Sequence, residues 1–232
     1  MEGVFTRRFV PHPYIQEKKE ERSMSKEVIL ELVKQLQEGY GDVINVTFHE
    51  GGDKYDIREG MKLSNGKTAS LRGTCHVEAC LGHVQADIHL YHVSVSSEEE
   101  LLETFVHELG HYLAYRKRFS FCYQEEEEII RLAQSVSDED EIILDVHQAL
   151  SVLEDVYGPY DKDQDISDML AEIDGYNHAI NLVELLDEAG LMEKSFFIRQ
   201  QIACFKTYQK LLALPEDRRE EFAAFIEELK AL

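Results

Sequence analysis

A change in hydrophobic periodicity near residue 96 constrains the fold of this chain more than any other sequence feature. Before it, apolar residues alternate with polar ones, most regularly from Val84 to Leu90, as in a strand with one buried face. From residue 97 to the end, apolar residues recur every three or four positions, which is typical of amphipathic helices. Strands gathered in one stretch and helices in another predict the α+β class.

The chain divides into a short tail and one domain. Residues 1–24 mix charges with prolines and show no sustained period, so we expect a tail without order of its own. Residues 25–232 are long enough for one domain with a sizeable core. We expect a helix over 26–38, a β-rich part over 43–95 and a helical part over 97–232. The prediction is a small antiparallel sheet packed against a mostly helical domain.

Turn residues divide both parts further. Asn65-Gly66 lies between two short strand-like runs and predicts a tight hairpin turn. Gly158-Pro159 and the polar residues after it interrupt the helical part. We expect helices over 97–117, 125–135, 139–156, 165–188, 193–213 and 216–230.

The chain is strongly acidic. It has 24 Lys and Arg against 46 Asp and Glu, a formal net charge of −22. Nucleic-acid backbones and anionic membranes would be repelled, so we expect neither as a partner. No stretch reaches the roughly 18–20 apolar residues of a membrane span, and the N-terminus has no secretory signal pattern. The four cysteines are then expected as reduced thiols in the cytoplasm.

Residues 107–111 read His-Glu-Leu-Gly-His and carry the main chemical signal of the sequence. Two histidines four positions apart lie one turn apart on the same face of a helix, where both imidazoles can bind one metal ion. Glu108 then lies beside that ion and can take a proton from a bound water, whose pKa zinc lowers to about 7. The same carboxyl can later pass the proton to a leaving amine.

The residues around this motif predict the helix that it requires. Ser97 followed by Glu100 fits a capping box at the helix N-terminus. The apolar stripe of the helix lies on a different face from both histidines. Its members are Leu102, Phe105, Val106, Leu109 and Leu113. Gly110 costs about 1 kcal/mol relative to alanine inside a helix, and a close approach by another backbone would explain it.

The run from His107 to Ala114 resembles the active-site helix of zincin metallopeptidases. It is similar to the gluzincin branch and, loosely, to the ImmA/IrrE-like peptidases of bacteria and phages. The resemblance implies that residues 25–232 form a zinc-dependent peptide hydrolase in which His107 and His111 bind Zn²⁺ and Glu108 is the general base. It also implies a third protein ligand on a later helix, often a glutamate.

Glu172 is our prediction for that third metal ligand. The segment from Glu172 to Ala179 is similar to the Glu-x-x-Ala-(Asp/Asn)-x-Phe-Ala pattern of the ImmA/IrrE-like group. On its helix Glu172 shares a face with Gly175, where a carboxylate could reach inward. The long interval after His111 requires a helical insertion near 120–160. The rival ligands are His147, Asp168, His178 and one of Glu125 to Glu128.

Two further expectations concern the substrate. By the same resemblance, an edge strand beside the metal helix receives an extended peptide by backbone pairing, and strand 83–92 is the candidate. Charge in the transition state needs a hydrogen-bond donor near the metal, and Tyr176, His178 and His147 qualify chemically.

The sequence therefore predicts a zinc metalloprotease that acts on a peptide or protein substrate. The alternative is a non-enzymatic acidic interaction or inhibitor protein, of the phage type, with a structural or vestigial metal site. The net charge of −22 favours this alternative, because such a surface binds basic partners.

Overall fold

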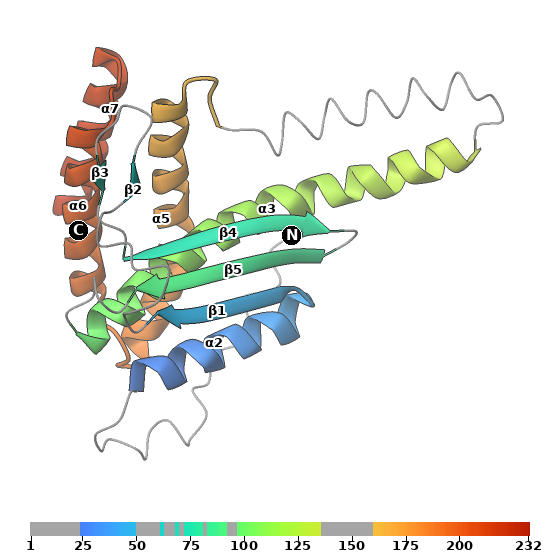
Figure 1. The fold of residues 1–232 in the computed structure, drawn as a ribbon, viewed down its shortest axis with the longest axis horizontal. Helices are drawn as coiled ribbons and strands as arrows, with labels where there is room; N and C mark the ends of the chain where they lie inside the picture. The colour runs from blue at the N-terminus through green and yellow to red at the C-terminus, as the bar shows by residue number, and fades with distance from the viewer. Residues whose placement is uncertain are drawn as a thin grey trace.

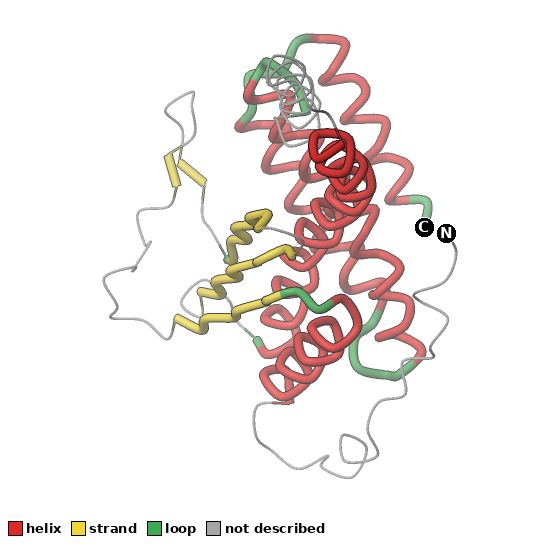
Figure 2. The backbone as a smooth tube through the Cα atoms, turned by 90° about the vertical axis from the view of Figure 1, so that its right-hand side faces the viewer, coloured by secondary structure: helices red, strands yellow, loops and turns green. Residues whose placement is uncertain are grey.

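The computed structural model describes residues 24–49, 61–62, 68–69, 72–80, 83–91, 97–135 and 160–232. In chain order, its elements are α2 (Met24–Tyr40), β1 (Val43–His49), β2 (Met61–Lys62), β3 (Thr68–Ala69), β4 (Gly73–Cys80), β5 (His83–Tyr91), α3 (Glu98–Ser135), α5 (Gln164–Glu188), α6 (Lys194–Leu211) and α7 (Glu216–Lys230). The helices lie on one side of a small sheet (Figures 1 and 2), and the predicted α+β class is confirmed.

The helices follow the predicted ranges closely, with one difference. The two helices expected over 97–117 and 125–135 are one continuous helix, α3, because no proline or glycine breaks the chain between them. Helices α5, α6 and α7 begin and end within two residues of expectation. The expected helix over 139–156 lies outside the described residues, as does the expected tail over 1–24 except for Met24, which is the first residue of α2.

The three-stranded sheet is mixed, whereas the sequence was expected to give an antiparallel one. Its order is β1-β5-β4; β5 runs parallel to β1 and antiparallel to β4. Strands β1 and β5 are not joined by a hairpin but by a long connection that contains β4, which permits a parallel pair. Strand β5 is therefore central, and the expectation that strand 83–92 is an exposed edge is wrong. Its alternation reflects one buried face, and β4 is an edge strand in the described sheet.

The strands around Asn65-Gly66 form an antiparallel pair, as a hairpin requires, but the register is centred on Asn65 and differs from that of the expected two-residue turn, which would place Lys62 opposite Ala69. Met61 lies opposite Ala69 and Lys62 lies opposite Thr68 in an antiparallel pair. The turn itself, over 63–67, lies outside the described residues.

Asp42 fastens the sheet to α3. It lies just before β1 and is buried; its carboxylate accepts hydrogen bonds from the Tyr112 hydroxyl at 2.7 Å and from the Val84 backbone N–H at 3.1 Å. Arg116 of α3 forms an ion pair with the same carboxylate. One side chain thus joins β1, β5 and the helix that carries the histidine motif.

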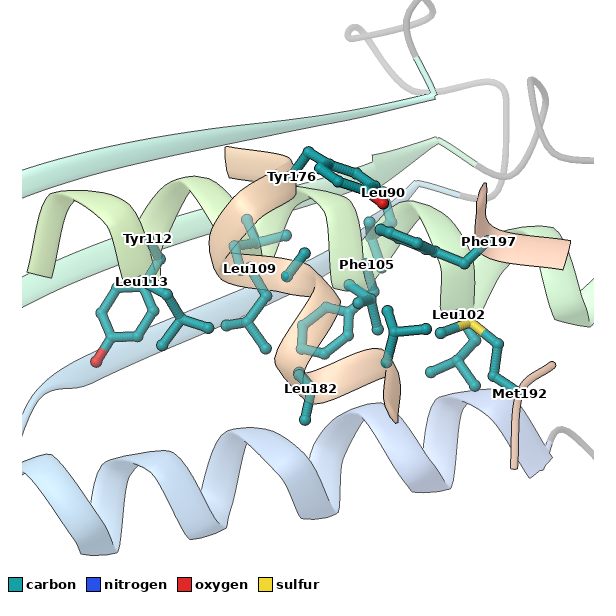
Figure 3. Close-up of a cluster of buried hydrophobic side chains, with 14 of the residues drawn as sticks. Leu90, Leu102, Phe105, Leu109, Tyr112, Leu113, Tyr176, Leu182, Met192 and Phe197 are labelled. Carbon is teal, nitrogen blue, oxygen red and sulfur yellow. The ribbon is translucent and has the colours of Figure 1, made fainter. Parts of the chain in front are cut away.

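Helix α3 lies at the centre of the core. Its apolar stripe, which includes Leu102, Phe105 and Leu109, is fully or almost fully buried, and each such side chain contributes about 1.5–3 kcal/mol to stability. Figure 3 shows these residues beside Leu182 of α5 and Phe197 of α6. Side chains of three helices therefore share one core.

An aromatic cluster holds α6 and α7 against α5. The ring of Tyr176 lies 6.1 Å from Phe197 and 6.0 Å from Phe205 between centroids, and Phe205 lies 5.7 Å from Phe222 in an edge-to-face pair. Such pairs contribute beyond the area they bury. The cluster fixes how α6 lies beside the histidine motif. Among the described helices, none has an apolar stretch long enough to cross a membrane.

Candidate metal centre

Helix α3 presents both histidines of the motif toward one point. The predicted cap is present, because the backbone N–H of Glu100 donates to the Ser97 hydroxyl at 3.2 Å. One turn of helix separates His107 from His111, and their Nε2 atoms lie 3.3 Å apart. The two rings are nearly perpendicular, at 89°, so two ring nitrogens converge where one ion could contact both.

Glu172 of α5 completes the group. Its Oε2 lies 3.4 Å from Nε2 of His107, and its Oε1 lies 3.8 Å from Nε2 of His111. One donor atom from each of the three residues falls within 4.8 Å of the other two. Oε2 is buried and has no hydrogen-bond partner in the described part of the chain. A buried acceptor of this kind is costly, and a cation would satisfy it, so the residues present fit a metal ion.

Two glycines allow α5 to approach α3 closely enough for Glu172 to reach the histidines. A Cβ atom on Gly110 would overlap the backbone oxygen of Gly175. A Cβ atom on Gly175 would lie 2.7 Å from Nδ1 of His111. The close approach by another backbone, which Gly110 led us to expect, is the crossing of α3 with α5.

Glu108 lies on the side of α3 that faces β4. Its side chain is buried, and a Cβ atom on Gly73 would lie 2.8 Å from both its Cγ and its Oε1. Because Gly73 has no side chain, the carboxyl of Glu108 fits into the space beside the first residue of β4. Burial raises the pKa of Glu108 to about 7, although His107 opposes the shift. Such a carboxyl can both accept and release a proton near neutral pH.

Each histidine has a second partner that holds its ring. Nδ1 of His107 lies 2.9 Å from Oε1 of Gln201 in α6, and His111 has a hydrogen bond with the backbone of Ala171. Burial lowers the pKa of His107, but the carboxylate of Glu172 and other acids outweigh it and keep that pKa above the ordinary value. In His111 burial prevails over the same carboxylate, and the pKa is lowered.

Helix α6 adds residues that the sequence reasoning missed. Tyr208 is hydrogen-bonded to Glu172, whose charge, together with burial, raises the pKa of the Tyr208 hydroxyl well above its usual range. Gln201 is 1% exposed although it is polar, and it is spaced by four from Phe197 and Phe205. A glutamine within an apolar stripe is the sequence signal that could have singled it out.

The rival ligands do not join the described metal group. Asp168, one turn before Glu172, accepts a hydrogen bond from Gln164 at 2.6 Å. His178 is paired with Asp174, 3.2 Å from its Oδ1. His147 lies outside the described residues, and the side chains of 125–128 lie outside them too.

Two of the three predicted hydrogen-bond donors lie away from the metal group, and the third, His147, is outside the described residues. Tyr176 lies in the aromatic cluster, and Nδ1 of His178 is 2.8 Å from the carbonyl of Asp174. Tyr208, in contrast, carries a hydroxyl beside Glu172.

Negative charge predominates in this centre. Three buried acids, Glu103, Glu108 and Glu172, surround His107, and Arg72 is 3.4 Å from Glu103. Burial raises the pKa of Glu103, although Arg72 opposes this. Uncompensated buried charge is expensive, so the centre favours a bound cation.

Two imidazoles and a carboxylate form a donor set that catalytic zinc uses, with a further position open to water or substrate. The roles of His107, His111 and Glu172 as metal ligands stay a prediction, as does the resemblance to zincins. Comparison with protein-family models, with curated proteins and with solved structures gives no match to this chain.

Proposed function

We propose that this protein is a zinc-dependent metallopeptidase of the cytoplasm, with His107, His111 and Glu172 as metal ligands. The observation that carries the proposal is the convergence of three donor atoms within 4.8 Å, with Glu108 buried beside them. Two of the proposed ligands come from the local motif and the third comes from a separate helix. If the motif were a chance match on a solvent-exposed helix face, no carboxylate from another helix would be expected next to its two histidines.

Each residue of the centre has a separate role in the proposed hydrolysis of a peptide bond. Bound zinc would polarise the substrate carbonyl and lower the pKa of a water molecule. Glu108 takes the proton from the attacking water and delivers it to the leaving amine; its pKa of about 7 suits both steps. The Tyr208 hydroxyl has one hydrogen, which is directed to Glu172 in this structure; by turning it toward a bound substrate, Tyr208 would donate a hydrogen bond to the carbonyl oxygen as that oxygen gains charge.

Strand β4 is the better candidate for holding an extended substrate. It pairs with β5 along one side only in the described sheet, so its other side can add a peptide strand by backbone hydrogen bonds. Gly73, its first residue, lies against Glu108. A peptide paired along β4 would therefore pass the general base.

The test combines metal content with turnover. Protein purified without chelators should hold about one zinc per chain and hydrolyse a fluorescence-quenched peptide library. Glu108→Gln keeps the shape and the ligand set, so it should retain the metal and lose hydrolysis. Asp168→Asn, on the same helix as Glu172 but outside the group, is the control and should retain both. Hydrolysis by the Glu108→Gln variant would contradict the proposal. So would the finding that the wild-type protein contains no bound metal.

An acidic protein that binds basic partners without catalysis remains the second candidate. Its support is the net charge of −22. It predicts binding to a basic protein that weakens steeply with salt, and no peptide hydrolysis whether the metal site is empty or filled.

A further inference from the structure

A series of polar contacts runs from His107 through the interior to the residue that precedes β4. Beyond the contact between His107 and Gln201, Nε2 of Gln201 donates to Oε1 of Glu103 at 2.7 Å. Oε2 of Glu103 lies 3.4 Å from Nη1 of Arg72, which also donates to Gln200 at 3.3 Å. Glu103 and Gln201 are each 1% exposed, so water cannot substitute easily for these contacts.

The donors and acceptors of this series can be arranged in only one direction. The Arg72 guanidinium only donates, and the ionised carboxylate beside it only accepts. Gln201 must then turn its NH₂ group toward Glu103 and its carbonyl oxygen toward His107. Because that oxygen accepts, Nδ1 of a neutral His107 carries the proton and Nε2 carries the lone pair. Nε2 is the atom that faces Glu172 at 3.4 Å.

We propose that Gln201 is a positioning residue which, oriented by Glu103 and Arg72, sets the tautomer of His107 so that Nε2 is free to bind a metal ion. The inference rests on the proposed metal centre and names the residues that prepare one of its ligands. The ring of His111 is held by a hydrogen bond with the backbone of Ala171, not with a side chain. A side-chain substitution therefore cannot remove this hydrogen bond directly.

Metal affinity is the first measurement. Gln201→Leu removes the acceptor at similar volume, and Glu103→Gln removes the charge that orients the Gln201 amide. Each should weaken Zn²⁺ and Co²⁺ binding by about 10–100-fold, the usual effect of losing such a partner, in titrations against a chromophoric chelator. Both changes act through one hydrogen bond, so the double variant should bind about as well as Gln201→Leu alone.

Gln200→Leu is the matched control on the same helix. It also removes a glutamine contact with Arg72, but it leaves Glu103, Gln201 and His107 connected. Its metal affinity should equal that of the wild type.

The tautomer itself is the second measurement, and a merely structural role would not change it. In metal-free protein with ¹⁵N-labelled histidine, NMR should show His107 protonated at Nδ1. In Gln201→Leu and in Glu103→Gln the Nε2-protonated form, which a free histidine side chain prefers, should gain population. If Gln201→Leu does not fold, Glu103→Gln decides by the same two measurements.

The possible failures are distinct. An unchanged tautomer in the variants, or losses of affinity that add in the double variant, would overturn the role of Gln201. Wild-type protein that binds no metal would instead overturn the proposed function, while the tautomer of the metal-free protein would still test the Gln201 contacts.

Discussion

At the scale of single residues, two buried oxygens without hydrogen-bond partners in the described chain have different meanings. Oε2 of Glu172 lies 3.4 Å from Nε2 of His107 in the candidate metal group, where a cation can satisfy it. The Tyr176 hydroxyl is also without a partner but lies among aromatic rings. Each such group costs about 1–3 kcal/mol, and only the environment of Glu172 offers a way to recover that cost.

Tyr208→Phe tests the donor assigned to the transition state. Removing one such donor typically lowers kcat by about 10²–10³-fold, and this loss should persist at saturating zinc, where the three remaining ligands keep the site filled even if the lost contact with Glu172 weakens metal affinity. Steady-state kinetics with the peptide library and metal analysis measure both.

Tyr176→Phe is the matched control for that experiment. It removes a hydroxyl that has no hydrogen-bond partner among the described residues, so kcat should be unchanged and the free energy of unfolding should stay equal or rise slightly. Equal kinetics for Tyr208→Phe and the wild type would show that Tyr208 is not the donor.

At the scale of elements, the crossing of α3 and α5 decides whether a metal centre can exist. Gly110 has backbone against it, and backbone cannot move aside as a flexible side chain can. We expect Gly110→Ala to separate the helices, to lower the free energy of unfolding by about 1–3 kcal/mol and to weaken metal binding. Denaturant unfolding and metal titration measure these effects.

Gly39→Ala in α2 is the control for the crossing. In the described part of the chain, no atom other than those of its chain neighbours and the adjacent backbone of its own helix lies within 4 Å of the added Cβ atom, so the variant should be stabilised by about 0.4–1 kcal/mol. If Gly110→Ala were equally stable and bound metal normally, the close crossing would not be required.

The pair of His178 with Asp174 within α5 predicts a dependence of stability on pH. The hydrogen bond to Asp174 raises the pKa of His178 above its ordinary value, although burial opposes this. A raised pKa in the folded state means that protonated His178 stabilises the protein at low pH. The contribution is complete below the unfolded pKa of about 6.5 and is lost as the pH rises through the folded pKa.

His178→Ala should therefore destabilise the protein more at about pH 5.5 than at about pH 8.5, as the linkage relation requires. Urea unfolding at both pH values measures the difference. The exposed neighbour Asn177 supplies a control, since Asn177→Ala should show no such dependence. An effect of His178→Ala that grows with pH would contradict the assigned pair.

At the scale of the whole molecule, a net charge of −22 and a centre rich in buried acids both favour a bound cation. Adding Zn²⁺ at about 100 times its dissociation constant should raise the free energy of unfolding by about 2.7 kcal/mol, and a chelator should reverse the gain. Glu172→Gln should lose most of this stabilisation, and Asp168→Asn should keep it. Thermal unfolding with and without zinc measures both, and equal midpoints in the wild type would argue against a metal centre.

Much of the fold followed from local patterns. The alternation in β5 and the periodicity of α3, α5, α6 and α7 correctly gave element type and approximate bounds, because burial of one face imposes a period of two or 3.6 on the residues themselves. The strand order did not follow, since pairing between β1 and β5 depends on how the long connection folds back. The mixed sheet and the central position of β5 were therefore missed.

The same division applies to the candidate centre. The sequence alone determined that His107 and His111 share a helix face with Glu108 beside them, because positions four apart are neighbours in any α-helix. Only the tertiary structure decided which distant side chains meet them: Glu172 through the glycine crossing, and Gln201 and Tyr208 through the packing of α6. Those contacts depend on the close packing of residues far apart in the chain, which no local period encodes.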